Sequence, residues 1–306
     1  MNGKIRERLL KFRTPRRIAQ FTSFIFFSAV FFSVSEPLPV PILWTARTPG
    51  YFALDALTAL QVTFSQPAFP WFAIASVLIM GILLGKSLCG WICPFGLIQD
   101  IVDFIKRGKR EISPRGHESL LYVKYAILIF TLLISVTFAV SKTTGASQGY
   151  ENALGIFAKA PFTLLSPAET LFGTIPEMIL GFRNAILEIP VLDALGGIVS
   201  LPLLFWVQLA LMISVLVFSA YVPRGWCKYF CPHGAIMAIL NRFSFLGLRR
   251  DPVKCAKGEC RLCVEVCPMN VRILDLPWEK FSDPECIYCL KCADSCSNGA
   301  ISLKYP

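Results

Sequence analysis

The sequence predicts an α-helical membrane protein in which four transmembrane helices, arranged as two parallel repeats, are followed by a small α+β domain rich in cysteine. Three observations lead to this fold class. Only 16% of the 306 residues are charged and the mean hydropathy is +0.58, whereas an ordinary soluble domain has about 25% charged residues. Apolar windows long enough to cross a bilayer occur four times. All twelve cysteines fall into four short motifs.

The four predicted spans lie at 18–35, 68–88, 120–140 and 200–222. Lys86 and Lys124 fall near span ends, so we expect both side chains to extend their ammonium groups toward the lipid headgroups. The segment 141–199 is too apolar for a free loop. We therefore expect short interfacial helices there, or a re-entrant piece.

The distribution of Lys and Arg predicts that both termini are cytoplasmic. Residues 1–17 carry seven basic residues and residues 36–67 carry one, Arg47, and cytoplasmic membrane flanks are enriched in basic residues. This orientation puts all four cysteine motifs on the reducing side, where closely spaced cysteines bind metal rather than form disulfides. The same flanks account for the net charge of +10, so no nucleic-acid partner is expected.

The predicted membrane domain, residues 1–242, repeats itself. Residues 18–107 and 120–242 each contain two spans, a C-x3-C-P motif and an amphipathic helix. The motifs Cys-Gly-Trp-Ile-Cys-Pro-Phe-Gly and Cys-Lys-Tyr-Phe-Cys-Pro-His-Gly align without a gap. Parallel repeats are typically related by an axis along the membrane normal. Such an axis would bring both cysteine pairs to equivalent positions at the inner face.

The cysteines of the two C-x3-C-P motifs are candidate metal ligands: Cys89, Cys93, Cys227 and Cys231. Proline disfavours helical geometry in the preceding residue and suits the first turn of a new helix. Each pair should therefore lie in a turn between a span and an interfacial helix. We expect one shared thiolate site, suited to an iron–sulfur centre, zinc or Cu(I). Two redox-active dithiols and two ordinary buried cysteine pairs are the alternatives.

Two smaller features carry weaker functional hypotheses. His233 follows Pro232 and is either a polar group that tunes the Cys231 site or an ordinary interfacial residue. Aromatic residues near the predicted outer interface would either line a quinone pocket, with Glu36 or Asp55 accepting protons, or form an aromatic belt; they are Trp44, Tyr51, Phe52 and Trp71. No haem-attachment or Gly-rich nucleotide motif is present.

Residues 243–306 form the predicted cysteine-rich domain. It contains a C-x4-C-x2-C-x3-C-P run that begins at Cys255 and a C-x2-C-x2-C-x3-C run that begins at Cys286. These are iron–sulfur spacings, whereas zinc usually takes two separated C-x2-C pairs. Short strands are expected at 243–249, 272–276 and 300–304.

This domain resembles a two-cluster bacterial ferredoxin, in which the fourth cysteine of each run ligates the other cluster. The resemblance implies two [4Fe–4S] clusters. Cluster 1 would be held by Cys255, Cys260, Cys263 and Cys296. Cluster 2 would be held by Cys286, Cys289, Cys292 and Cys267. Because the domain is small, the clusters should form much of its core.

The two C-x3-C-P motifs followed by a two-cluster run resemble the NapH/MauN family, which is related to larger polyferredoxins of the NosR and CcoG type. The resemblance covers nearly the whole chain. It implies a bacterial inner-membrane protein that passes electrons between the quinone pool and a respiratory or periplasmic reductase, as a quinol dehydrogenase component. Its redox partner would be a separate ferredoxin or a multihaem cytochrome. The rival hypothesis is a membrane reductase or assembly factor for the maturation of a copper or iron enzyme.

Overall fold

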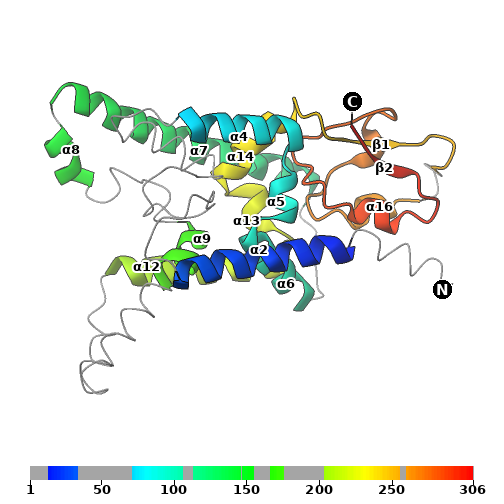
Figure 1. The fold of residues 1–306 in the computed structure, drawn as a ribbon, viewed down its shortest axis with the longest axis horizontal. Helices are drawn as coiled ribbons and strands as arrows, with labels where there is room; N and C mark the ends of the chain where they lie inside the picture. The colour runs from blue at the N-terminus through cyan, green and yellow to red at the C-terminus, as the bar shows by residue number, and fades with distance from the viewer. Residues whose placement is uncertain are drawn as a thin grey trace, which may run out of the picture. The chain divides into compact units, whose positions relative to one another are not determined.

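The computed structural model describes residues 13–33, 71–105, 113–145, 147–154, 166–175, 203–255 and 260–305. Within these ranges the protein is mostly helical, with one small two-stranded sheet (Figure 1). The longer helices are α2 (Arg13–Ser33), α4 (Trp71–Leu84), α6 (Pro94–Ile105), α7 (Pro114–Thr143), α8 (Ser147–Leu154), α12 (Leu203–Tyr221) and α14 (Pro232–Asn241). The shorter ones are α5 (Ser87–Trp91), α9 (Pro167–Glu169), α13 (Gly225–Tyr229), α15 (Leu262–Glu265) and α16 (Lys291–Ser295).

The chain divides into two compact units. The first comprises residues 1–25, 75–126 and 219–306, and the second comprises 26–74 and 127–218. The first unit contains both C-x3-C-P motifs and all the C-terminal cysteines. Every contact in the candidate site described below therefore lies within one unit.

Two helices of the described residues are long and apolar enough to cross a membrane, Arg115–Thr143 and Leu203–Tyr221. Apolar side chains cover much of the exposed surface of the first of them; Phe130, for example, is 66% exposed. Its buried side chains recur at helical spacing along one stripe: Lys124, Leu128, Thr131, Ser135 and Phe138. An apolar surface with a narrow buried stripe suggests a membrane protein. Helices α2 and α4 occupy parts of the other two predicted windows, and the four-span layout stays a prediction.

Both C-x3-C-P motifs fold in the same way, with a short helix, a break at the second cysteine and a new helix that begins at the proline. The amide of Cys93 donates to the Leu88 carbonyl at 3.0 Å, and that of Cys231 donates to the Trp226 carbonyl at 3.0 Å. After the break, the Gly96 amide donates to the Cys93 sulfur at 3.3 Å, and the Gly234 amide donates to the Cys231 sulfur at 3.4 Å. The breaks expected from the two prolines are therefore present.

Helix α6 is amphipathic, and its polar face is the one turned into the protein. Gln99 is fully buried, while Phe104 and Ile105 are 65% and 76% exposed. An apolar face directed outward is what a helix at the membrane interface presents to lipid. The polar face is then free to supply hydrogen bonds and a charge to the interior.

The C-terminal domain contains the small sheet. Strand β1 (Gly247–Arg250) pairs antiparallel with β2 (Ile301–Lys304), with Gly247 opposite Lys304. Two of the three expected strands therefore form, each near its predicted position.

The third expected strand, at 272–276, is wrong, because this segment contains the 3₁₀ helix η4 (Ile273–Asp275). The buried Arg250 guanidinium donates to three carbonyls of the segment: those of Ile273, Leu274 and Leu276. The same guanidinium stacks on the Trp278 ring, 3.8 Å from its centroid. A single guanidinium can reach three carbonyls so close together only if they converge on it, which a turn allows and an extended strand does not.

Part of the segment 141–199 is described. It contains α8 and the short run formed by α9 and the π-helix η3 (Thr170–Thr174). Short helices are therefore present where they were expected. The rest of this segment, and all the quinone-pocket candidates except Trp71 at the start of α4, lie outside the described residues.

The C-terminal domain shares its core with the first C-x3-C-P turn. Leu88 and Cys89 of α5 belong to the same buried apolar cluster as Ile287, Tyr288 and Cys289. The ring nitrogen of Trp91 also donates to the Tyr288 carbonyl at 2.9 Å. The close approach requires a glycine at position 90, because an added Cβ would collide with the carbonyl oxygen of Ile287.

Gly90→Ala should therefore weaken the attachment of the C-terminal domain. We expect a lower melting temperature in detergent and faster proteolysis between residues 243 and 306, because the obstructing atom belongs to the backbone and cannot rotate away. Gly149→Ala on α8 is the control, since its added Cβ meets nothing within 4 Å. Equal melting temperatures for the two variants would contradict the close contact.

Candidate functional site

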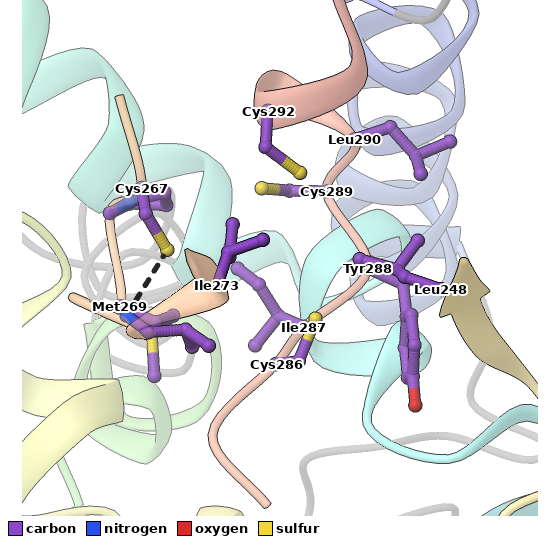
Figure 2. A pocket seen from close by; sticks show the side chains of 12 residues that line it. Leu248, Cys267, Met269, Ile273, Cys286, Ile287, Tyr288, Cys289, Leu290 and Cys292 are labelled. Atoms are coloured by element: carbon purple, nitrogen blue, oxygen red, sulfur yellow. Dashed lines mark hydrogen bonds between the residues drawn. The ribbon is translucent and has the colours of Figure 1, made fainter. Parts of the chain in front are cut away.

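Four C-terminal cysteines line one pocket: Cys267, Cys286, Cys289 and Cys292 (Figure 2). We call them the inner cysteine group. They are the four residues that the ferredoxin rule assigns to cluster 2. The remaining lining is almost entirely apolar and includes Ile273, Ile287 and Leu290. Four thiols in an apolar enclosure form a donor set suited to an iron–sulfur cluster.

Burial has a strong effect on the inner thiols. It raises the pKa of Cys267 to about 11, with a further increase from the neighbouring Cys289 thiolate. Burial also raises the pKa of Cys286 and of Cys292 well above that of an ordinary thiol. Free thiolates are thus unfavourable in this pocket, whereas a bound metal keeps its cysteine ligands deprotonated.

The outer cysteine group consists of the four residues expected for cluster 1: Cys255, Cys260, Cys263 and Cys296. Burial raises the pKa of Cys263, and the thiolates of Cys255 and Cys260 raise it further, so these three lie close enough to interact. The Cys296 sulfur accepts a hydrogen bond from the Ala300 amide at 3.3 Å. Residues 256–259, between the first two cysteines, lie outside the described ranges.

The C-x3-C-P cysteines of the two repeats approach one another. The thiolates of Cys227 and Cys89 add to the effect of burial in raising the pKa of Cys93. Burial likewise raises the pKa of Cys227, where Arg224 opposes and Cys89 reinforces the increase. Cys231 occupies the turn equivalent to that of Cys93. The described residues contain no group of three or more His, Cys, Asp or Glu side chains arranged to hold a single metal ion.

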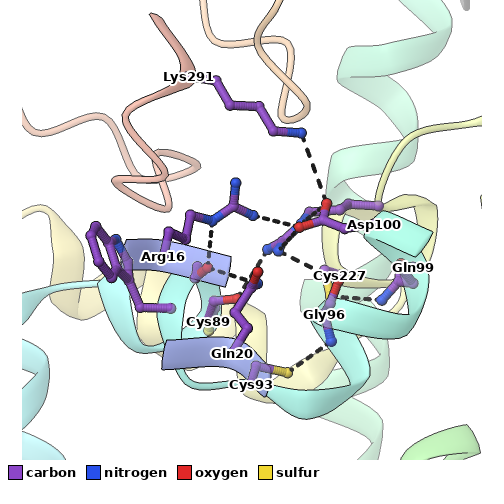
Figure 3. A network of polar contacts seen from close by, with 12 residues as sticks. Arg16, Gln20, Cys89, Cys93, Gly96, Gln99, Asp100, Cys227 and Lys291 are labelled. Carbon is purple, nitrogen blue, oxygen red and sulfur yellow. Dashed lines mark hydrogen bonds and ion pairs between the residues drawn. The ribbon is translucent and has the colours of Figure 1, made fainter. Parts of the chain in front are cut away.

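Each repeat supplies a polar side chain to a cysteine of the other. The Gln99 amide nitrogen of the first repeat donates to the Cys227 sulfur at 3.0 Å (Figure 3). His233 of the second repeat lies near enough to Cys89 to act on its thiol. The expectation that His233 tunes the Cys231 site stays a prediction. Burial raises the pKa of Cys89, yet His233 and the nearby cations outweigh burial and lower it overall.

Asp100 of α6 joins two buried arginines. It accepts from Arg224 at 3.0 and 2.8 Å and from Arg16 of α2, and the Lys291 ammonium lies 4.0 Å away (Figure 3). The arginines also hold the first motif, because Arg224 donates to the Cys89 carbonyl and Arg16 to the Gly90 carbonyl, both at 3.0 Å. Burial raises the pKa of Asp100, but its two guanidinium partners lower it far more, so the carboxylate stays ionised.

Glu285, next to Cys286, joins two buried lysines in the same way. It accepts from Lys86 at 2.9 Å and from Lys124, and both lysines are almost completely buried. The expectation that Lys86 and Lys124 extend to the headgroups is therefore wrong. The buried Glu285 carboxylate forms an ion pair with both ammonium groups and so replaces the hydration that they would have at the headgroups.

The loop that carries Glu285 and Cys286 is also tied to α14. The Asn241 amide nitrogen donates to the carbonyls of Asp283 and Cys286, at 2.6 and 3.2 Å, while its oxygen accepts from the Lys86 amide at 3.1 Å. One fully buried side chain thus connects this loop to both repeats.

Positive φ angles, uncommon outside glycine, occur at four non-glycine residues of the described chain: Arg224, Asn270, Tyr288 and Leu290. All four are within three residues of a cysteine. Such strain is found where the surrounding structure fixes a functional geometry.

Comparison with known proteins bears on the chemistry of the motifs. The domain described as "4Fe-4S binding domain" matches the chain twice, over residues 66–112 and 204–250. Each match contains one C-x3-C-P motif at the same relative position, and both matches end before Cys255. Two copies of a [4Fe–4S]-binding domain fit two clusters.

The relatives include proteins named as ferredoxin-type or electron-transport proteins. An uncharacterized protein of Methanocaldococcus jannaschii is 26% identical over 75% of this chain and 76% of its own length. The methylamine utilization ferredoxin-type protein MauN of Methylobacillus flagellatus is 22% identical over 86% and 77%, respectively. The ferredoxin-type protein NapH of Haemophilus influenzae is 23% identical over 85% and 73%. The chain fits the NapH/MauN/NosR family.

Some relatives are longer than this chain, which matches only part of them. They include a putative electron transport protein, YccM of Escherichia coli, and the much longer NirI of Paracoccus denitrificans, of which the chain spans 26%. No solved structure matches the chain.

Sequence reasoning missed the charged residues that surround the cysteines. The aligned repeats did contain a signal, because Lys86 and Arg224 each stand three residues before the first cysteine of a motif. Basic residues at the same position in both repeats, beside cysteines, indicate a role at the motif rather than a contact with lipid headgroups. Their partners could not be deduced, because Glu285 lies far away along the chain.

Glu285→Gln should strongly destabilise the first compact unit, because it leaves two buried lysines without a counter-charge. Removing one partner of a buried ion pair costs about 3–5 kcal/mol. The matched control is Glu118→Gln, which breaks the exposed pair between Glu118 and Arg272 and should cost less than about 1 kcal/mol. Denaturation in detergent micelles, followed by circular dichroism, measures both. Comparable small losses would show that Glu285 is dispensable for folding.

Proposed function

We propose that this protein is the membrane electron-transfer component of a quinol dehydrogenase system in a bacterial inner membrane. It would cross the membrane four times, with both termini, the 243–306 domain and all cysteine motifs on the cytoplasmic side. Electrons would pass between the quinone pool and a redox partner such as a separate ferredoxin or a multihaem cytochrome. The observation that supports this most is the shared core of Cys89 and Cys289, which joins the membrane-domain motif to the iron–sulfur domain.

The cofactor assignment rests on the two cysteine groups of the C-terminal domain. Cys267, Cys286, Cys289 and Cys292 would hold cluster 2, and Cys255, Cys260, Cys263 and Cys296 would hold cluster 1. A bound [4Fe–4S] cluster supplies reversible one-electron storage. The apolar pocket would exclude water from a bound cluster 2, and the Val271 amide, which donates to the Cys267 sulfur at 3.4 Å, would stabilise negative charge there.

We assign Cys89, Cys93, Cys227 and Cys231 to one additional metal site, shared by the two repeats. The hydrogen bond from Gln99 of the first repeat to the Cys227 sulfur of the second, at 3.0 Å, is the contact that favours a single site. A quinone would bind at the opposite side of the membrane, near Trp44 and Trp71.

Anaerobic purification with quantified iron, sulfide, zinc and copper tests the function. We expect two interacting S = 1/2 centres in the EPR spectrum after chemical reduction, and partial reduction of the same centres by a short-chain quinol. Stoichiometric zinc without iron would refute the clusters. Iron–sulfur centres that never exchange electrons with quinol or quinone, in a protein that binds Cu(I), would favour an assembly factor instead.

The shared thiolate site predicts that its cysteines act as a unit. Single Cys→Ser changes at Cys93 and at Cys231 should cause similar losses of metal and of electron transfer, because each leaves an incomplete ligand set. The double change should add little to either single change, since groups that act together are non-additive. Losses that simply add across the repeats, with unchanged metal content, would indicate two independent dithiols.

A further inference from the structure

The ion cluster on Asp100 contains more positive than negative charge. Arg16 and Arg224 are 4% and 0% exposed, and both pair with the single carboxylate, which Lys291 also approaches. One carboxylate cannot neutralise two guanidinium groups. Buried charge without compensation costs several kcal/mol, so this arrangement favours an anion close by.

The inner cysteine group is in a position to supply that anion. Arg224 donates to the Cys89 carbonyl at 3.0 Å, and Cys89 shares its buried apolar cluster with Cys289 and Cys292 of the inner group. Lys291 is also the neighbour in sequence of Cys292. The cations therefore gather at one end of the inner group, the end that faces the first C-x3-C-P turn.

The acidic groups near the inner cysteines do not cancel this positive excess. Glu285 and Asp283 lie beside Cys286, and the two buried lysines there, Lys86 and Lys124, offset their two charges. The outer cysteine group has a different setting. Beside Cys255, Val253 is 92% exposed and the Lys254 side chain is 60% exposed, so water and salt screen the charges there.

We propose that the buried Arg16–Asp100–Arg224 cluster sets the reduction potential of cluster 2 and makes it the higher-potential cluster of the C-terminal domain. This rests on the proposed cluster assignment. Reduction adds one negative charge to a cluster, and fixed positive charge nearby stabilises the reduced form and raises the potential. One electron leaves cluster 1, which is oxidised, and reaches cluster 2, which is reduced, with no proton transferred. The electron then resides beside the first C-x3-C-P turn.

The test is an EPR-monitored redox titration of the full-length protein. In a Cys255→Ser background, which lacks cluster 1, the remaining signal belongs to cluster 2. Arg16→Gln should lower its midpoint potential, because a positive charge is lost. Arg16→Lys, which keeps the charge, should restore most of the shift. Arg272→Gln, at an exposed pair, is the control and should leave the potential unchanged.

The Asp100→Asn variant distinguishes an electrostatic effect on the potential from a structural disruption of the site. It removes a negative charge, so the midpoint potential of cluster 2 should rise, opposite to the change in Arg16→Gln. Shifts in the same direction for both variants would overturn the proposal, as would an unchanged potential in Arg16→Gln. Iron content distinguishes the two failures, since a protein without iron contradicts the cluster assignment, whereas iron-replete variants with the wrong shifts contradict only the role of the charges.

Discussion

Two buried carboxylates, Asp100 and Glu285, hold the first compact unit together by forming ion pairs with four buried basic side chains. Each carboxylate binds one base from the first helix of a repeat, Arg16 or Lys124, and one from the turn before a cysteine motif, Arg224 or Lys86. An unpaired charge at any of these positions would cost several kcal/mol. The pairs therefore fix where α2, α7 and both motifs lie around the cysteines.

The two carboxylates come from different parts of the chain, which explains why the C-terminal domain belongs to the same unit as the motifs. Asp100 follows the second cysteine of the first motif by seven residues, and the equivalent position in the second repeat is the buried Ala238. The second repeat thus lacks a carboxylate at this position. Glu285 supplies it from the loop that carries Cys286, so the iron–sulfur domain completes the charge balance of the repeat.

The parts of the fold that sequence predicted correctly depend on local chemistry. A proline fixes the break at Cys93, and β1 and β2 lie within or next to the two short segments expected to be strands. The errors share a nonlocal cause. Lys86 and Lys124 look like span-end lysines until Glu285 is placed beside them, and 272–276 looks like a strand until Arg250 captures its carbonyls. Local pattern cannot show a partner that is more than twenty residues away, as each of these is.

The inner cysteine group combines Cys267 of the first C-terminal run with three cysteines of the second run, and each C-x3-C-P turn contacts one of these two runs. In the first turn, Trp91 donates to the Tyr288 carbonyl at 2.9 Å, beside Cys289. In the second turn, the equivalent of Gly90 is Lys228, which donates to the Asn270 side chain at 3.1 Å, three residues after Cys267. Each turn therefore anchors one of the two loops that contribute to the inner cysteine group. Because Cys267 joins the cysteines of the second run, the inner group is held by both repeats at once, and a shift of either turn would displace a ligand.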